Sequence, residues 1–127
     1  MAAEQEYASA QYMIGFIYYN GYGVEQDYTI AQEWFHMAAE QEYVSAQYMI
    51  GFIYYNGYGV EEDYTIALEW FHLAAEQGND AAQYMIGNMY RYGHGVEQDN
   101  IEALDWYQKA ADQGLDIAKN IIEEYYN

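Results

Sequence analysis

Apolar and polar positions along this chain follow the spacing of amphipathic helices. In residues 28–41, Ala31, Trp34, Phe35 and Ala38 stand three or four residues apart, which places them on one face of a helix. Off that face lie the polar residues Thr29, Glu33, His36 and Glu40. The pattern predicts a helix over residues 28–41 that buries this face.

A second helix-period pattern precedes the first one, in residues 8–20. Ala10, Ile14 and Ile17 fall on one side at 100° per residue, so we expect them to form a core stripe. Gly15 lies on the flank of that stripe. A glycine inside a helix costs about 1 kcal/mol relative to alanine, so we expect a neighbouring helix to approach closely there.

Turn signals separate and end these helices. Residues 21–27 contain two glycines, which permit positive φ, and finish with Asp27, a good N-cap for the following helix. Later helices end at Gly78 and Gly114, which suits a left-handed C-terminal residue. Glu42 takes that place once, and we expect its turn to be strained or of another type.

The whole pattern returns every 36 residues. A fixed period of this length predicts a repeat array, here an all-α, α/α solenoid of about three helix-loop-helix units. We expect one domain over residues 1–127, divided as follows: 1–7, a remnant of a preceding helix; 8–43, 44–79 and 80–115, the repeats; 116–127, a C-terminal capping helix.

The two ends of the array differ. In residues 116–127, Glu123 stands where Gly15 stands in the first unit, so one face of this helix is polar, as a cap requires. Residues 1–7 repeat residues 37–43 and provide no such cap. We therefore expect self-association through the N-terminal end.

These positions resemble a known family, the Sel-one-like repeat, a relative of the tetratricopeptide repeat. The residues that match its pattern in the first unit are Ala10, Ile14, Gly15, Tyr18, Gly21, Gly23, Val24, Asp27, Ala31, Trp34, Phe35, Ala38 and Ala39. Residues 46–75 and 82–111 match it again, and Glu6 and Glu42 depart from it. The resemblance implies antiparallel helix pairs stacked in a right-handed superhelix with a concave face, and an adaptor or scaffold role.

Charge narrows the possible partners. The chain has 21 Asp and Glu against three Lys and Arg, for a net charge of −18. Phosphate-based nucleic-acid binding and anionic membranes are excluded, because nothing can replace the counterions. Basic proteins or peptides are favoured. With no Cys, no disulfide or thiolate metal site is possible.

Candidate catalytic and metal-binding patterns are sparse. Two E-x-x-H pairs place possible ligands on one helical face; they are Glu33/His36 and Glu69/His72. The third unit has Asp105 and Gln108 instead, so we expect a solvated helix face and no metal. No nucleophile–base arrangement or phosphate loop is present, and we expect no cofactor and no enzymatic activity.

An aromatic stripe lies opposite the expected core of the first helix in each of two units. It comprises Tyr12, Phe16, Tyr19, Tyr48, Phe52 and Tyr55. The same positions hold Tyr84, Asn88 and Arg91 in the third unit, and Asn120, Glu124 and Asn127 in the cap. A buried position does not readily accept Asn, Arg and Glu, so we expect these positions to face solvent and to form a protein-binding surface.

The leading hypothesis is a non-enzymatic scaffold that binds a protein or peptide, of basic character, on an aromatic and acidic concave face. Two alternatives stay open. One is an acidic decoy that occupies a nucleic-acid-binding surface. The other is an engineered or excised repeat fragment with no function of its own.

Overall fold

The structure is a computed structural model that describes residues 2–126, with side chains described for residues 6–126. Within this range all regular structure is helical, which confirms the all-α prediction. The elements are α1 (Ala2–Asn20), α2 (Tyr28–Glu40), α3 (Val44–Asn56), α4 (Tyr64–Glu76), α5 (Asp80–Tyr92), α6 (Asn100–Asp112), α7 (Asp116–Ile121) and the π-helix η1 (Ile122–Tyr126). No helix in residues 2–126 is long and apolar enough to cross a membrane.

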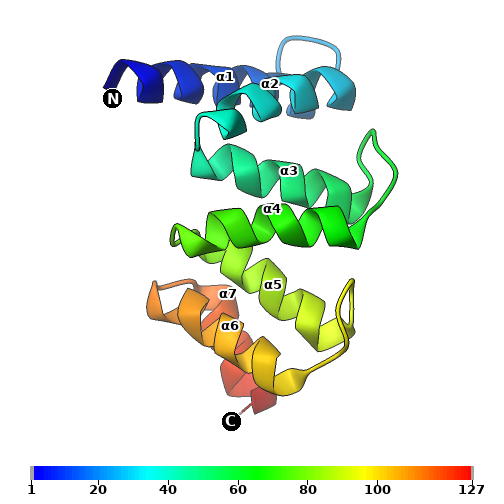
Figure 1. Cartoon of the computed structure of the whole chain (residues 1–127), viewed down its shortest axis with the longest axis vertical. Coiled ribbons are helices and arrows are strands. Elements are labelled where there is room, and N and C mark those ends of the chain that lie inside the picture. The colour runs from blue at the N-terminus through cyan, green and yellow to red at the C-terminus, as the bar shows by residue number, and fades with distance from the viewer. Residues whose placement is uncertain (1, 127) are drawn as a thin grey trace. The chain divides into compact units, whose positions relative to one another are not determined.

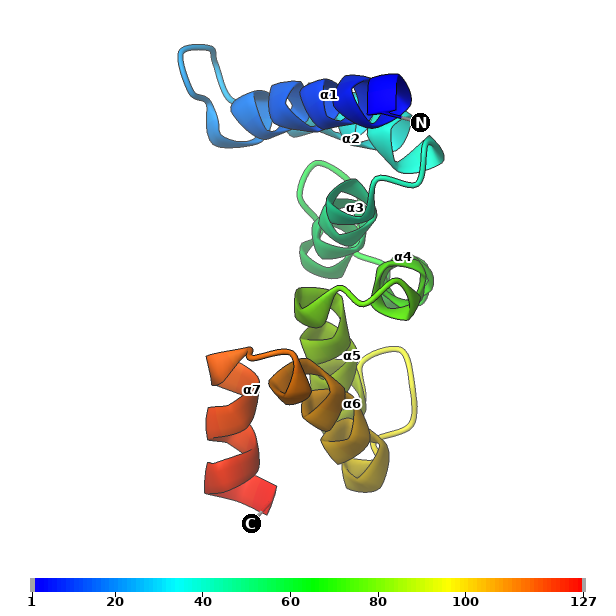
Figure 2. The same cartoon turned by 90° about the vertical axis from the view of Figure 1, so that its left-hand side faces the viewer.

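The helices form two compact units, Met1–Trp70 and Phe71–Asn127, and α4 runs through the boundary. In the first unit α1 and α2 lie side by side, joined by a loop, and α2 also packs on α3 (Figure 1). In the second unit α5 pairs with α6 in the same way, and α7 lies beside α6 (Figure 2). The first unit therefore contains the α1–α2 pair, α3 and the first part of α4. The second unit contains the rest of α4, the α5–α6 pair, α7 and η1.

The helix pairs close around an aromatic ring that packs against a glycine. A Cβ added to Gly15 would lie 2.8 Å from a ring carbon of Phe35, and one added to Gly87 would lie 2.7 Å from the ring of Tyr107. Phe35 and Tyr107 are fully buried. This confirms that the helical glycine is needed for close approach, because any side chain there would collide with the core ring.

The predicted helix ends are present. Asp27 caps α2 by accepting a hydrogen bond from the backbone N–H of Ile30 at 3.0 Å. Glu42 has φ +61°, in the same turn position as Gly78 at +88° and Gly114 at +96°. The turn is therefore of the same type as in the other repeats, with a side chain in the left-handed region that favours glycine.

One seven-residue sequence adopts two structures. Residues 1–7 and 37–43 both read MAAEQEY. In residues 37–43, α2 ends and the chain turns so that α3 can pack on α2. At the N-terminus α1 continues unbroken from Ala2, so the expected end of a preceding helix near Glu6 is wrong; Met1 lies outside the described residues. Ala, Glu and Gln are strong helix formers, and no packing partner in the described residues favours a turn there.

The expected core stripe of α1 is only partly buried. Ala10 is exposed, and Ile14 and Ile17 are half-buried, so the expectation of a core stripe is wrong for α1. The equivalent residues of α3 and α5 are fully buried; they are Ala46, Ile50, Ile53, Ala82, Ile86 and Met89. The difference arises because α2 covers this face of α3, whereas no described element covers it on α1.

The C-terminal cap is shorter as an α-helix than expected. The segment 116–127 forms α7 and then η1, and Asn127 lies outside the described residues. Ala118 is buried against Ala110 and Ala111 of α6, while Glu123 is exposed. Contacts from η1 to the rest of the second unit add to this packing, because the hydroxyl of Tyr126 donates to Oδ1 of Asn100 at 2.9 Å.

Candidate protein-interaction surface

Six aromatic side chains of α1 and α3 form the candidate surface, which we call the aromatic face. They are Tyr12, Phe16, Tyr19, Tyr48, Phe52 and Tyr55, and all belong to the first compact unit. Each is half-buried. They are therefore neither fully buried core residues nor fully exposed ones.

The α1 half of the aromatic face rests on the core ring of Phe35. The ring centroids of Tyr12 and Tyr19 lie 5.6 and 6.3 Å from that of Phe35. Phe16 lies between them, 5.7 Å from Tyr12 and 5.9 Å from Tyr19. Distances of this size are typical of attractive aromatic pairs. The three rings thus form a continuous row with fixed positions.

Burial changes the acidity of the two tyrosines in this row. It raises the pKa of Tyr19 to about 12, and neighbouring Tyr58 and Tyr28 contribute in the same direction. Burial also raises the pKa of Tyr12, helped by Tyr43. Both hydroxyls therefore stay neutral at physiological pH and keep an O–H group that can donate a hydrogen bond.

Tyr58 connects the two halves of the aromatic face. Its ring lies 6.2 Å from Tyr19 on α1 and 6.1 Å from Phe52 on α3, and it stacks on Tyr28 at 5.2 Å with 15° between the planes. Tyr28 and Tyr58 are not among the site residues predicted from the sequence. Their recurrence at fixed places in the repeat was the available signal, but a helical period says nothing about where a loop side chain points.

The third repeat replaces the aromatic row by a polar cluster. Tyr84, Asn88 and Arg91 of α5 are all half-buried. The hydroxyl of Tyr107 donates to Oδ1 of Asn88 at 2.5 Å, and Tyr107 stands where the first repeat has Phe35. Burial raises the pKa of Tyr107, and the Arg91 guanidinium acts in the opposite direction.

Arg91 is held by the C-terminal cap. Its guanidinium carbon lies 4.2 Å above the ring of Tyr125 and 5.1 Å from that of Tyr92, as in cation–π pairs. The nine candidate residues thus form two groups, six in the aromatic face of the first unit and three in a polar cluster of the second. Asn88 and Arg91 already have internal partners.

The two E-x-x-H histidines do not lie on a purely solvated face. His36 is half-buried, with its ring edge-on to Trp70 at 5.5 Å, and His72 meets Trp106 in the same way at 5.4 Å. Burial lowers the pKa of His36, and Glu40 opposes the shift. The expectation of a solvated face is therefore wrong for the histidines. In residues 2–126, no three His, Cys, Asp or Glu side chains group as a metal site would require.

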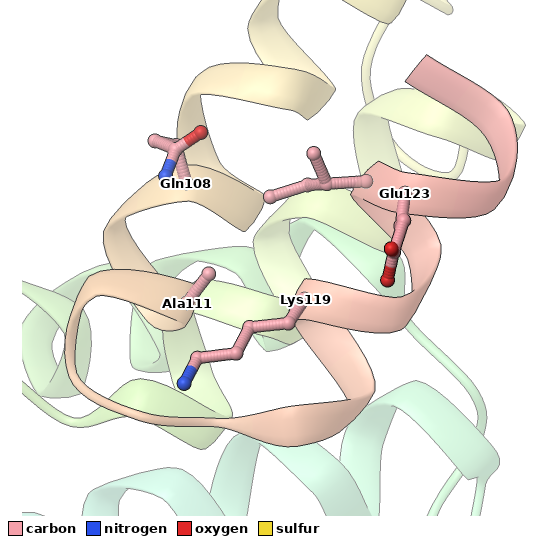
Figure 3. A pocket seen from close by; sticks show the side chains of 5 residues that line it. Gln108, Ala111, Lys119 and Glu123 are labelled. Atoms are coloured by element: carbon pink, nitrogen blue, oxygen red, sulfur yellow. The ribbon is translucent and has the colours of Figure 1, made fainter. Parts of the chain in front are cut away.

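A pocket of about 240 Å³ opens between α6 and the cap, lined by Gln108, Ala111, Lys119, Ile122 and Glu123 (Figure 3). Gln108 and Ala111 come from α6, and Lys119 and Glu123 from α7 and η1. The lining holds one amine and one carboxylate but no nucleophile beside a base, so it does not define a reaction.

Three helix-loop-helix repeats with these contacts define a helical-repeat protein of the α/α solenoid class. The Sel1 repeat family model matches residues 8–43, 44–79 and 80–115. The chain belongs to the Sel1 repeat family, whose members typically act as non-enzymatic scaffolds for protein–protein interaction.

Solved structures agree with this assignment. A Sel1 repeat protein from Oxalobacter formigenes is 41% identical, with TM-score 0.82, over 93% of this chain and 89% of that chain. The protective antigen c5321 of uropathogenic Escherichia coli, which displays an SLR fold, is 44% identical with TM-score 0.85; the match covers 92% of this chain and only 25% of that chain.

A more distant likeness shows the fold alone. The cysteine rich protein B of Helicobacter pylori is 18% identical, with TM-score 0.73, over 91% of this chain and 90% of that chain. A search of curated protein sequences finds no significant match.

Proposed function

We propose that this chain is a non-enzymatic scaffold that binds a basic protein or peptide on the aromatic face. One observation carries the proposal: six half-exposed aromatic rings, five of them linked by ring contacts through Tyr58, lie in a unit that contains no Lys or Arg. All three cationic residues lie in the second unit, at Arg91, Lys109 and Lys119, whereas residues 1–70 contain eleven Asp and Glu.

The two components of this surface have separate roles. Aromatic rings held by their neighbours supply contact area without losing side-chain freedom on binding, and Tyr is enriched among binding hot spots. The ring faces also attract Lys and Arg through cation–π contacts. The surrounding carboxylates raise the association rate of cationic partners and disfavour anionic ones.

The first test uses peptides of equal length and different charge. We would titrate the chain with peptides of about twelve residues carrying about six Lys, no net charge, or about six Glu, and follow binding by intrinsic fluorescence. The proposal predicts binding of the cationic peptide alone. Equal binding of all three, or of none, would contradict a basic partner.

A matched pair of variants then locates the site. The first carries Phe16→Asn with Phe35→Tyr, which copies the third repeat at those two positions and supplies the hydroxyl partner that Asn88 has. The control is Tyr22→Asn, which removes an exposed aromatic ring outside the aromatic face. The first variant should lose about 2 kcal/mol of binding free energy, as at an interface hot spot, and the control should lose almost none.

A salt series separates this surface from an acidic decoy. Salt screens charge pairs but leaves aromatic contact area largely unaffected, so binding to the aromatic face should persist at about 0.5 M sodium chloride. A mimic of nucleic acid would lose its affinity steeply over the same range.

A further inference from the structure

The side of α1 that faces away from the aromatic face is apolar, and no described element of the chain covers it. We call it the outer face of α1; it consists of Ala10, Met13, Ile14 and Ile17. Met13 is 56% exposed, whereas the equivalent Met49 and Met85 are 7% and 8% exposed. The same residue types at the same repeat positions are thus buried in α3 and α5. The outer face of α1 has the composition of a packing surface without the packing partner.

A polar side chain shows what kind of partner is missing. Gln11 lies beside the outer face and is only 5% exposed. Its carbonyl oxygen accepts a hydrogen bond from Nε2 of Gln41 at 2.6 Å. Its own amide nitrogen has, in the described part of the chain, only the sulfur of Met37 as acceptor, at 4.0 Å. A thioether is a weak acceptor, so this buried donor is poorly satisfied.

The third repeat shows the complete arrangement. Gln83 occupies the place of Gln11, and its carbonyl oxygen accepts from Nε2 of Gln113 at 2.7 Å. Its amide nitrogen donates to the backbone carbonyl of Ala75, in the last turn of α4, at 3.2 Å. The Ala75 carbonyl also accepts the backbone N–H of Gly78 at 3.0 Å, so Gln83 uses its second lone pair. Among the described residues, no such carbonyl meets Gln11.

The missing partner is therefore a helix of the kind that ends each repeat, with small residues and a last-turn carbonyl that, like those of Ala75 and Ala111, accepts a backbone N–H from the turn and can accept a second hydrogen bond. We propose that α6 of a second copy of this chain takes this role, with its carbonyl at Ala111 meeting Gln11 and its Ala110–Ala111 surface covering Met13. These alanines stand at the repeat positions of Ala74 and Ala75, so α6 offers the same small surface.

In a single copy, α7 occupies this surface of α6. It places Ala118, Ile121, Ile122 and Tyr125 at the repeat positions of Ala10, Met13, Ile14 and Ile17. The fit is less complete than between repeats, since Lys119 stands where Gln11 and Gln83 stand. The pocket of about 240 Å³ that Lys119 and Ala111 both line lies at this joint (Figure 3). The outer face of α1 supplies the glutamine that this joint lacks.

Association competes with α7 for the same surface. Because α7 is tethered next to α6, its effective concentration is on the order of millimolar, and a second copy binds only as α7 departs. The contact of Tyr125 with Arg91 and the hydrogen bond of Tyr126 to Asn100 hold the cap in place. Two chains of charge −18 also repel each other. We therefore expect weak, head-to-tail association that strengthens with salt and with a loosened cap.

Sedimentation of the full chain at about 0.5 M sodium chloride, where charge repulsion is screened, tests the proposal. Three variants accompany the wild type. Met13→Glu puts a charge on the outer face of α1. Leu73→Glu is its control, since Leu73 is similarly exposed, at 45%, but lies on α4. Tyr125→Ser with Tyr126→Ser removes the contacts of the cap to Arg91, Asn100 and Tyr107 and changes no residue of α5 or α6.

The loosened-cap variant should associate at least tenfold more tightly than the wild type, because α7 competes less. Adding Met13→Glu to it should abolish association, and adding Leu73→Glu should not. A loosened-cap variant that stays monomeric at about 0.5 mM would overturn the proposal. Association that Met13→Glu removes but cap loosening leaves unchanged would also overturn it, since two α1 outer faces would then pair with each other.

Discussion

The hydrogen bond between Tyr107 and Asn88 in the third repeat leads to a prediction about two substitutions at the equivalent positions of the first repeat. Phe16 and Asn88 are equivalent, as are Phe35 and Tyr107. The asparagine is accompanied by a tyrosine whose hydroxyl donates to it at 2.5 Å. We predict that the two changes are coupled, so that each alone destabilises the first repeat and the pair together costs less than the sum of the two.

The expected magnitudes follow from the contacts. Phe16→Asn removes two ring pairs, with Tyr12 and Tyr19, each worth about 0.5–1.5 kcal/mol, so it should cost about 2 kcal/mol of unfolding free energy. Phe35→Tyr places a hydroxyl at a fully buried position with no partner, at a cost of about 1–3 kcal/mol. In the double variant the hydroxyl meets the new amide, which should recover about 2 kcal/mol.

Urea unfolding of the four proteins, followed by far-ultraviolet circular dichroism, measures this coupling. The reverse cycle, Asn88→Phe with Tyr107→Phe in the third repeat, is the matched control and should show coupling of the same sign. A coupling energy below about 0.5 kcal/mol in both cycles would refute the reasoning, because the hydrogen bond would then not explain the polar pair.

Three further predictions concern stability. Glu42→Gly should stabilise the chain by about 0.5–1 kcal/mol in urea, because it relieves a left-handed residue, whereas Glu40→Gly inside α2 should destabilise it. Gly23→Ala should lower the free energy of unfolding by about 1–2 kcal/mol, because Gly23 has φ +75°, in the left-handed region. Gly59→Ala should lower it clearly more, because Gly59 has the same φ and a Cβ there would also lie 2.6 Å from the Cβ of Tyr28. The melting temperature should be higher in about 0.5 M than in about 0.02 M sodium chloride, since 21 acidic residues repel one another; an unchanged value would show that repulsion is insignificant.

Local sequence predicted most of the helices and turns. The 3.6-residue period and the capping residues identify the helices, and the glycine inside each first helix is explained by Phe35 and Tyr107. These features depend on residues close in sequence or on the repeat itself. The resemblance to the Sel-one-like repeat further indicated how the helices pair and stack, as an α/α solenoid.

Features that depend on distant partners were missed. Periodicity shows which face of α1 is apolar, but not whether another helix covers it, so the exposure of Ala10 and Met13 was not foreseen. His36 is opposite the apolar stripe of its own helix, yet it packs on Trp70, which is 34 positions away. Helical phase alone cannot show such a contact, because it describes one helix without its neighbours.

The aromatic face was predicted by comparing repeats with one another, and that comparison also had a limit. It identified positions 16 and 88 as equivalent and concluded that they face solvent. The structure shows half-buried side chains instead, and it shows that Asn88 depends on Tyr107. A change at one position of a repeat is compensated by a change elsewhere, which an isolated comparison of positions does not reveal.

The central claim, that the aromatic face is the binding surface, can be tested through the four phenylalanines of the chain. Phe16 and Phe52 lie on the aromatic face, whereas Phe35 and Phe71 are fully buried. With only phenylalanine rings isotopically labelled, nuclear magnetic resonance would follow a titration with the cationic peptide. The ring signals of Phe16 and Phe52 should shift strongly, and those of Phe35 and Phe71 should shift little. Saturable binding that leaves Phe16 and Phe52 unmoved would contradict it.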